Sequence, residues 1–303
     1  MGETRPVSVP PGLSATPGSI KGTAVSTAHH AGVIAFYDAH PINEHEILRK
    51  VEGAGADLAA LTESDLKAFD QDHYGGFEAT DTLAEAGDIR GEHWVLDVCS
   101  GLGGPARWLA YRFGCKVTGL DLTTSRIEGA RRLTDRVGLS SLVDFVEGDA
   151  TRMPLSSGRF DRVIGQEAWV HIEDKATLFS ECHRVLKHGG LLAFTDIIAC
   201  APLTSSETEQ LARDMRFPPI VSAPHYLERL APAGFNVLRK DDLSLAWRQI
   251  LVDRLQMYRS LRETTVERFG EAHFEKWDRM YSAFVSLFVS GKLGGTRVVA
   301  RST

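Results

Sequence analysis

The sequence predicts an α/β fold built on a doubly wound, mostly parallel sheet of seven strands, and three observations lead to this prediction. From Trp94 onward, short apolar runs alternate with amphipathic stretches, as expected of βαβ units. A glycine-rich turn at residues 101–104 follows the first apolar run, at the sheet edge where such folds bind ligands. The segments 236–243 and 296–300 suggest a final hairpin, so the last strand is expected to be antiparallel.

Ahead of the sheet we expect a tail and then a helical cap. Residues 1–30 are rich in Pro, Gly, Ser and Thr, and such a composition buries too little apolar surface to order itself. A helical stretch is expected from residue 31 to residue 50. Thr62 and Asp65 form a pattern like a capping box, which marks a helix start. These features predict a helical cap over residues 31–90.

The core is expected over residues 91–303, with five strands followed by a hairpin. The five strands are predicted at residues 94–98, 116–120, 143–147, 162–165 and 191–195. Helical patterns are predicted at about 105–113, 123–137, 174–187 and 222–233. The residues between Ala201 and the last of these helices form a polar segment. Two amphipathic helices are expected within a helical insertion at about 244–290, ahead of the last strand.

Composition and charge limit the kind of partner. The chain of 303 residues has a net charge of −6 and shows no basic stripe, which argues against nucleic acid and favours a small molecule. No stretch reaches the roughly 18–20 apolar residues that cross a bilayer, and no signal peptide is visible, so we expect a cytoplasmic protein without a membrane partner. Four scattered cysteines indicate a reducing compartment. A homo-oligomer is compatible with these features.

No metal site is predicted. His29 and His30 fall in the expected tail, and His40, Glu44 and His45 lack the spacing of two ligands on one helix face. The sequence also lacks a G-x-S-x-G nucleophile elbow.

Acidic residues follow three successive predicted strands. Asp97 ends the first strand, where a carboxylate suits the ammonium group of a bound methionine moiety. Asp121 ends the second strand and can accept hydrogen bonds from a ribose diol. Asp149 follows the third strand and can accept from an adenine amino group, while the next backbone N–H, that of Ala150, can donate to a ring nitrogen. Each acid alone fits a solvated loop, but three at successive strand ends favour a cofactor with these three parts.

The glycine pattern leaves another cofactor open. Residues 101–106 fit the G-x-G-x-x-A form of a nicotinamide or flavin dinucleotide site, and Asp121 suits either cofactor. Asp97 favours the methionine-bearing cofactor, because a carboxylate would be repelled by the negative charge of a pyrophosphate. A nicotinamide-dependent oxidoreductase therefore stays an alternative, which the order of the last strands would decide.

Five segments carry these features in a fixed order: Val95–Gly104, Gly119–Leu122, Gly148–Ala150, Phe160–Glu167 and Glu181–Gly190. In order and spacing they resemble the motif series of class I S-adenosylmethionine (SAM)-dependent methyltransferases. The resemblance implies a Rossmann-like sheet with SAM as the cofactor. The residues that the motifs and their strand ends place at the cofactor are Tyr74, Asp97, Ser100, Gly101, Gly103, Asp121, Leu122, Asp149, Ala150 and Gln166. The sequence departs from the pattern at Cys99, where many members have glycine.

Within that class, Tyr74-Gly75-Gly76 and the segment Gln166–His171 look like the sarcosine/dimethylglycine N-methyltransferase group. Relatives of that group methylate small amines, and enzymes acting on phosphoethanolamine, sterols and phenols are near it. The resemblance implies methyl transfer to a small polar metabolite, an amine in the first place. O- or S-methylation of another small molecule, or a SAM-binding protein without catalysis, stays open.

The methyl acceptor is expected next to the fourth strand. His171 could remove a proton from an amine nucleophile, although a packing role fits it equally well. Trp169, Tyr74 and Trp247 offer aromatic faces for a cationic group, and the resemblance places Tyr74 among the catalytic residues as well. Arg216 follows the fifth strand, where an arginine could clamp a substrate carboxylate.

Overall fold

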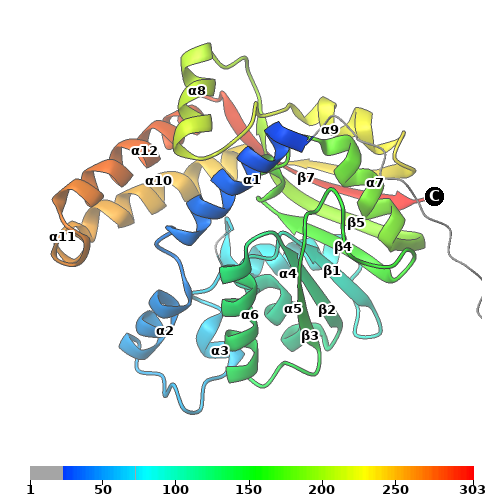
Figure 1. Cartoon of the computed structure of the whole chain (residues 1–303), viewed down its shortest axis with the longest axis horizontal. Coiled ribbons are helices and arrows are strands. Elements are labelled where there is room, and N and C mark those ends of the chain that lie inside the picture. Colours follow the sequence, from blue (N-terminus) through cyan, green and yellow to red (C-terminus); the bar gives the residue numbers. More distant parts are fainter. Residues whose placement is uncertain (1–22, 72) are drawn as a thin grey trace, which may run out of the picture.

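The computed structural model describes residues 23–71 and 73–303, and its centre is a seven-stranded sheet with helices on both faces (Figure 1). The strand order is β3-β2-β1-β4-β5-β7-β6, and all strands run parallel except β7, which is antiparallel to β5 and β6. The strands are β1 (Trp94–Val98), β2 (Lys116–Asp121), β3 (Val143–Glu147), β4 (Phe160–Gln166), β5 (Leu186–Ala199), β6 (Phe235–Asp242) and β7 (Leu293–Ser302). This topology confirms the predicted sheet with its antiparallel last strand.

Helices that alternate with the strands cover the two faces of the sheet. They are α4 (Gly76–Ala86), α5 (Gly104–Phe113), α6 (Thr124–Arg136), α7 (Lys175–Val185) and α9 (Ala223–Leu230). A further helix, α8 (Ser205–Asp214), lies in the segment for which the sequence predicted only polar chain. A capping box starts α8, since the Thr204 N–H donates to the Glu207 carboxylate at 2.8 Å and the Glu207 N–H donates to the Thr204 hydroxyl at 3.2 Å.

Segments before and after the parallel strands add helices outside these layers. Three precede the sheet: α1 (Thr23–Asp38), α2 (Glu44–Gly53) and α3 (Glu63–Leu66). Three more form an arm ahead of β7: α10 (Ser244–Ser260), α11 (Arg262–Phe269) and α12 (Glu271–Val289). In Figure 1, α1 lies between this arm and the helices beside the sheet.

The boundary of the expected tail is partly wrong. Residues 23–30 are the first turns of α1, because contacts with the rest of the protein override their composition. His29 Nε2, for example, lies 2.7 Å from the backbone carbonyl of His171. Residues 1–22 of the expected tail lie outside the described residues.

The central strands are buried on both faces, as parallel strands in α/β proteins are. In β1, Leu96 belongs to one apolar cluster and Val95 to the cluster on the other face. β4 repeats this alternation with Val163 and Ile164. All four side chains are buried, so a continuous apolar run in the sequence corresponds to packing on two sides of the strand.

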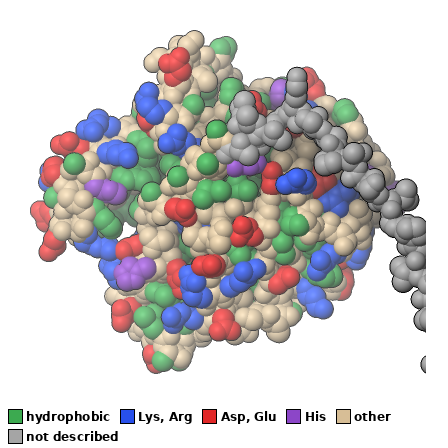
Figure 2. All heavy atoms as spheres, in the orientation of Figure 1, with side chains coloured by type: hydrophobic (Ala, Val, Ile, Leu, Met, Phe, Trp, Pro, Cys, Tyr) green, Lys and Arg blue, Asp and Glu red, His purple; other side chains and the backbone are tan. Residues whose placement is uncertain are grey.

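None of the described helices is both long and apolar enough to cross a membrane. On the face shown in Figure 2, acidic and basic side chains are interspersed.

A buried arginine fixes the segment ahead of the sheet to the glycine-rich turn. The Arg107 guanidinium is fully buried and donates to Asp70 Oδ2 at 2.8 Å and to the Leu102 carbonyl at 2.7 Å. Glu63 Oε2 lies 3.5 Å from Arg107 Nε, but burial and the nearby Asp70 charge raise the pKa of Glu63 well above its usual value. Leu66 packs with Leu102 in one apolar cluster. The cap and the turn therefore form one packed unit.

We predict that two amide substitutions in this cluster lower the free energy of unfolding by very different amounts. Asp70→Asn removes the charge that Arg107 pairs with, and losing one partner of a buried pair costs about 3–5 kcal/mol of unfolding free energy. Glu63→Gln replaces a carboxyl that the folded state already keeps protonated, so we expect a loss below about 1.5 kcal/mol, as for a volume-conserving change. Urea unfolding of both variants measures this difference, and equal losses would contradict it.

The pH dependence gives a second measurement on the same variants. Because the folded-state pKa of Glu63 is raised, the folded protein holds a proton that the unfolded chain releases above an ordinary pKa of 4.5. The Glu63 contribution to stability therefore falls as the pH rises above that value. Glu63→Gln should lose this component of the pH dependence entirely, whereas Asp70→Asn should reduce it without removing it, because burial still raises the pKa of Glu63.

Candidate active site

A cavity of about 630 Å³ opens at the carboxyl ends of β1, β2, β3 and β4. The strand order reverses between β1 and β4, and open α/β sheets bind ligands at such a switch point. The loops after these strands line the cavity, and side chains of α1 and α12 complete its walls. Its volume suits a cofactor together with a small second ligand.

Two carboxylates lie at the ends of β1 and β2, and the one on β1 is buried. Asp97 is 2% exposed, and its Oδ2 has no hydrogen-bond partner among the described residues. Burial, and then the charge of Asp121, raise the pKa of Asp97 to about 7. Asp121 accepts from the N–H groups of Gly101 and Thr123, both at 2.9 Å, and burial raises its pKa as well. A cationic group beside Asp97 would offset the cost of this arrangement.

The turn after β1 brings backbone close to the cavity. Gly103 has φ +77°, and a Cβ there would lie 2.5 Å from Phe145 Cζ, so a side chain does not fit. Ser100 and Gly101 line the cavity, whereas Gly103 does not and instead packs against Phe145. The Ser100 hydroxyl is buried without a hydrogen-bond partner among the described residues, which makes it a second polar group available to a ligand. Cys99 takes a positive φ of 68°, the conformation that glycine adopts more easily.

The loop after β3 supplies the third predicted acid. Asp149 Oδ1 accepts from the Thr151 N–H at 2.8 Å and from its hydroxyl at 2.7 Å. Asp149 Oδ2 faces the cap, 3.9 Å from His30 Nε2. Ala150 and Leu122 also line the cavity. The described cavity thus brings together every residue predicted at the cofactor except Gly103.

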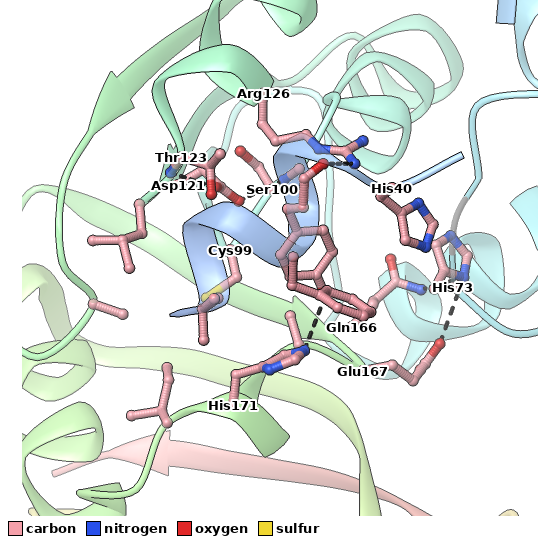
Figure 3. Close-up of a pocket in the computed structure, with 18 of the residues that line it drawn as sticks. His40, His73, Cys99, Ser100, Asp121, Thr123, Arg126, Gln166, Glu167 and His171 are labelled. Carbon is pink, nitrogen blue, oxygen red and sulfur yellow. Dashed lines mark hydrogen bonds and ion pairs between the residues drawn. The ribbon is translucent and has the colours of Figure 1, made fainter. Parts of the chain in front are cut away.

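Residues at the end of β4 connect the cavity to the loop before α4. Glu167 Oε2 accepts from the Tyr74 N–H at 2.6 Å, and Oε1 accepts from the Thr195 hydroxyl at 2.5 Å. Gln166 Nε2 lies 3.2 Å from His73 Nδ1, and Figure 3 shows both side chains beside Glu167. Burial raises the pKa of Glu167 to about 8. This carboxyl therefore holds Tyr74 at the cavity, a link between distant segments that the sequence did not reveal.

His171 lies at the cavity as predicted, and its surroundings keep it neutral. The ring is 8% exposed, and burial lowers its pKa to about 3. Nε2 lies 3.0 Å from the Tyr37 hydroxyl of α1, while Nδ1 lies 3.4 Å from the Arg216 carbonyl. With the ring proton on Nδ1, directed at that carbonyl, Nε2 accepts a hydrogen bond.

The predicted position of Trp169 at the acceptor is wrong. The 3-10 helix after β4 (Trp169–His171) turns Trp169 into the core, where its ring is fully buried and stacks on Phe194 with 4.7 Å between centroids. Its Nε1 donates to the Val98 carbonyl at 3.2 Å. A Cβ on Gly165 would lie 2.4 Å from this indole, so the absence of a side chain at Gly165 makes room for it.

Trp247 and Arg216 are likewise not among the residues that line the cavity. Trp247 packs in the core behind Tyr74, with 5.0 Å between the ring centroids, and covers Gly295. Arg216 is exposed, and its side chain lies beside Gly32 of α1. Neither side chain lines the cavity, so the predicted positions of both at the substrate are wrong.

Several cavity residues come from segments that the sequence did not connect to the site. Those of α1 and the loop after it include Phe36, Tyr37 and His40, and those of α12 are Trp277, Tyr281 and Phe284. The spacing of the α12 residues, i, i+4 and i+7, marks one face of a helix, but an apolar face alone does not show which partner it contacts. No group of three or more potential metal ligands is found among the described residues.

The fold and this cavity define the class of protein, and comparisons with known proteins agree. A family model described as "Methyltransferase domain" matches residues 96–194. A methyltransferase of Streptomyces halstedii, GfsG, is 32% identical over 58% of this chain and 69% of its own length. A glycine/sarcosine/dimethylglycine N-methyltransferase of Actinopolyspora halophila is 31% identical over 52% of this chain and 28% of its own length. The chain belongs to the methyltransferase family.

Further relatives share the fold and show the breadth of the family. A Haemonchus contortus phosphoethanolamine N-methyltransferase, solved in complex with SAM, has the same fold, with a TM-score of 0.72 and 19% identity over 89% of this chain and 60% of that one. This protein is a SAM-dependent methyltransferase, so the nicotinamide-dependent alternative is wrong. Other curated relatives are sterol 24-C- and phosphoethanolamine N-methyltransferases, and the family therefore does not fix the acceptor.

We predict that Asp97 makes cofactor binding depend on pH. Above its pKa of about 7 the carboxylate can pair with the ammonium of S-adenosylhomocysteine, whereas below it the free protein must first lose a proton. The dissociation constant measured by calorimetry should therefore rise as the pH falls from about 8 to about 5.5. Asp97→Asn should weaken binding by about 1.5–3 kcal/mol at the higher pH and abolish this dependence.

The exposed Asp253 of α10 offers a matched control. Asp253→Asn should keep the wild-type affinity and its pH profile. The assignment of Asp97 fails if its own amide variant binds as tightly as this control.

Proposed function

We propose that the protein transfers the methyl group of SAM to an amine of a small-molecule acceptor bound beside His171. The observation that carries this proposal is the pair formed by His171 Nε2 and the Tyr37 hydroxyl, 3.0 Å apart, at the cavity that also contains Asp97. Asp97 ends β1, and His171 follows the neighbouring strand β4, so the two side chains approach the cavity from adjacent strands. A methionine moiety held at Asp97 would direct its methyl group toward this pair.

For methyl transfer the protein mainly has to position the acceptor, because the methyl group of SAM is already activated. The sulfonium of SAM is already an electrophile: the amine lone pair attacks the methyl carbon, the carbon–sulfur bond breaks, and S-adenosylhomocysteine leaves. The amine must give up a proton to be nucleophilic. A neutral imidazole acceptor and a phenol hydroxyl can align the amine and pass its proton on toward solvent.

The low pKa of His171 changes the role expected of it. A base with a pKa of about 3 has little affinity for a proton at neutral pH, and this weakens the general-base function that the sequence suggested. Hydrogen bonding to the attacking group does not require that affinity. We therefore assign His171 first to aligning the acceptor, with Tyr37 as its partner. A hydroxyl acceptor could form hydrogen bonds with the same two side chains, His171 and Tyr37. O-methylation is therefore the second candidate.

We predict that His171→Ala lowers single-turnover methyl transfer by less than the roughly 10²–10⁴-fold expected of a general base, because the ring aligns the acceptor rather than taking its proton. Tyr37→Phe should lower the rate in the same direction, because it removes the hydroxyl and keeps the ring. His188→Ala, at an exposed position, is the matched control. Labelled SAM with a panel of small amines and phenols gives the rate, and thermal melting of the same samples reports folding.

A purely structural role would show as a lower melting temperature of His171→Ala with turnover per folded molecule nearly kept. That outcome would remove His171 from the mechanism. Absence of transfer to every acceptor, despite tight SAM binding, would instead favour a SAM-binding protein without catalysis.

A further inference from the structure

The part of the cavity beyond His171 is walled by aromatic side chains from two helices far apart in the sequence. Phe36 of α1 lies 6.4 Å, centroid to centroid, from both the His171 ring and the Trp277 ring of α12. His40 closes the same gap at 5.9 Å from Trp277. Phe217 packs edge-on against His171, with 4.9 Å between the ring centroids. These rings enclose the position where the acceptor must present its nucleophile.

The remaining wall is apolar as well. Trp277, Tyr281 and Phe284 project from one face of α12 into the cavity, and Phe284 lies 6.0 Å from Phe217. Ile197 at the end of β5 and Met215 after α8 also line the cavity. Side chains of this kind bind a ligand by removing its apolar surface from water.

The two arginines among the described residues that line this cavity, Arg126 and Arg254, bind backbone carbonyls. Arg126 donates to the backbone carbonyls of Ile42 and Tyr37, at 2.6 and 2.7 Å. Arg254 donates to the His73 carbonyl at 2.5 Å, with its guanidinium 5.2 Å from the Tyr74 ring. Both arginines thus hold the segments that roof the cavity. A compact acceptor with its own carboxylate would therefore contact mainly aromatic rings here, and not a guanidinium group placed to bind that carboxylate.

We propose that the acceptor carries its amine on an apolar body, a ring system or an alkyl chain of several carbons, which lies between α1 and α12. The identity of the nucleophile rests on the proposed function, but the apolar subsite does not. Both helices lie outside residues 96–194, the part matched by the family model, so this specificity is a property of the added segments.

Calorimetry of the protein saturated with S-adenosylhomocysteine tests the subsite, with the n-alkylamines from butylamine to octylamine as probes. Each methylene that leaves water contributes about 0.8 kcal/mol, so the dissociation constant should fall about fourfold per added carbon. Sarcosine and dimethylglycine should bind more weakly than the longer amines. Affinity that does not depend on chain length, or tighter binding of sarcosine, overturns the proposal.

Variants of α12 place the effect in this cavity. Trp277 is half-buried, and Trp277→Ala should reduce the gain per carbon to about twofold or less because one wall is removed. Tyr281→Ala is a second variant, and melting temperatures of both report folding. Phe269→Ala is the matched control, since Phe269 is 46% exposed on α11 and does not line the cavity. An unchanged chain-length dependence in both α12 variants overturns the subsite.

Incubation of the same amines with labelled SAM separates the two proposals. Binding that depends on chain length without methyl transfer supports the apolar subsite and contradicts the amine assignment. Transfer to sarcosine and to alkylamines alike, without any effect of length on affinity, supports the amine assignment and contradicts the subsite.

Discussion

Two carboxylates at the ends of neighbouring strands are the constraint on which this site depends. Asp97 and Asp121 end β1 and β2, and the charge of Asp121 adds to burial in raising the pKa of Asp97 to about 7. The two carboxylates lie close together because the parallel strands bring their carboxyl ends to one edge of the sheet. Donors from the turn at Gly101 and Thr123 satisfy Asp121, whereas Asp97 keeps one oxygen without a hydrogen-bond partner among the described residues. A ligand with an ammonium group and a diol complements this pair.

Hydrogen bonds and ion pairs between buried polar groups also fix the segments around the sheet. Arg107 joins Asp70 of the cap to the glycine-rich turn, and Glu167 joins Tyr74 to β5 through Thr195. These links hold Asp70 and Tyr74, which precede the sheet, against the glycine-rich turn and β4, and the Tyr37 hydroxyl of α1 separately reaches His171. The proposed acceptor side therefore draws on α1 and α12, which lie outside the part that the family model matches, together with His171, which lies within it.

The sequence predicted most of the sheet and the cofactor side because both depend on local patterns. Buried strands appear as apolar runs, and Asp97, Asp121 and Asp149 mark strand ends one by one. The acceptor side depends on which way a side chain points, and chain position does not encode that. Trp169 follows β4 as expected, yet the turn after the strand directs it into the core. Phe36 and Trp277 meet only because the fold brings α1 and α12 to the same cavity, so neither segment alone could reveal the aromatic wall.

The most direct test of this account is a crystal structure of the protein with S-adenosylhomocysteine. The account predicts the ammonium group within hydrogen-bonding distance of Asp97, the ribose diol at Asp121, and the sulfur facing the space between His171 and Tyr37. A cofactor whose ammonium contacts another carboxylate, or whose sulfur faces away from that pair, would contradict it.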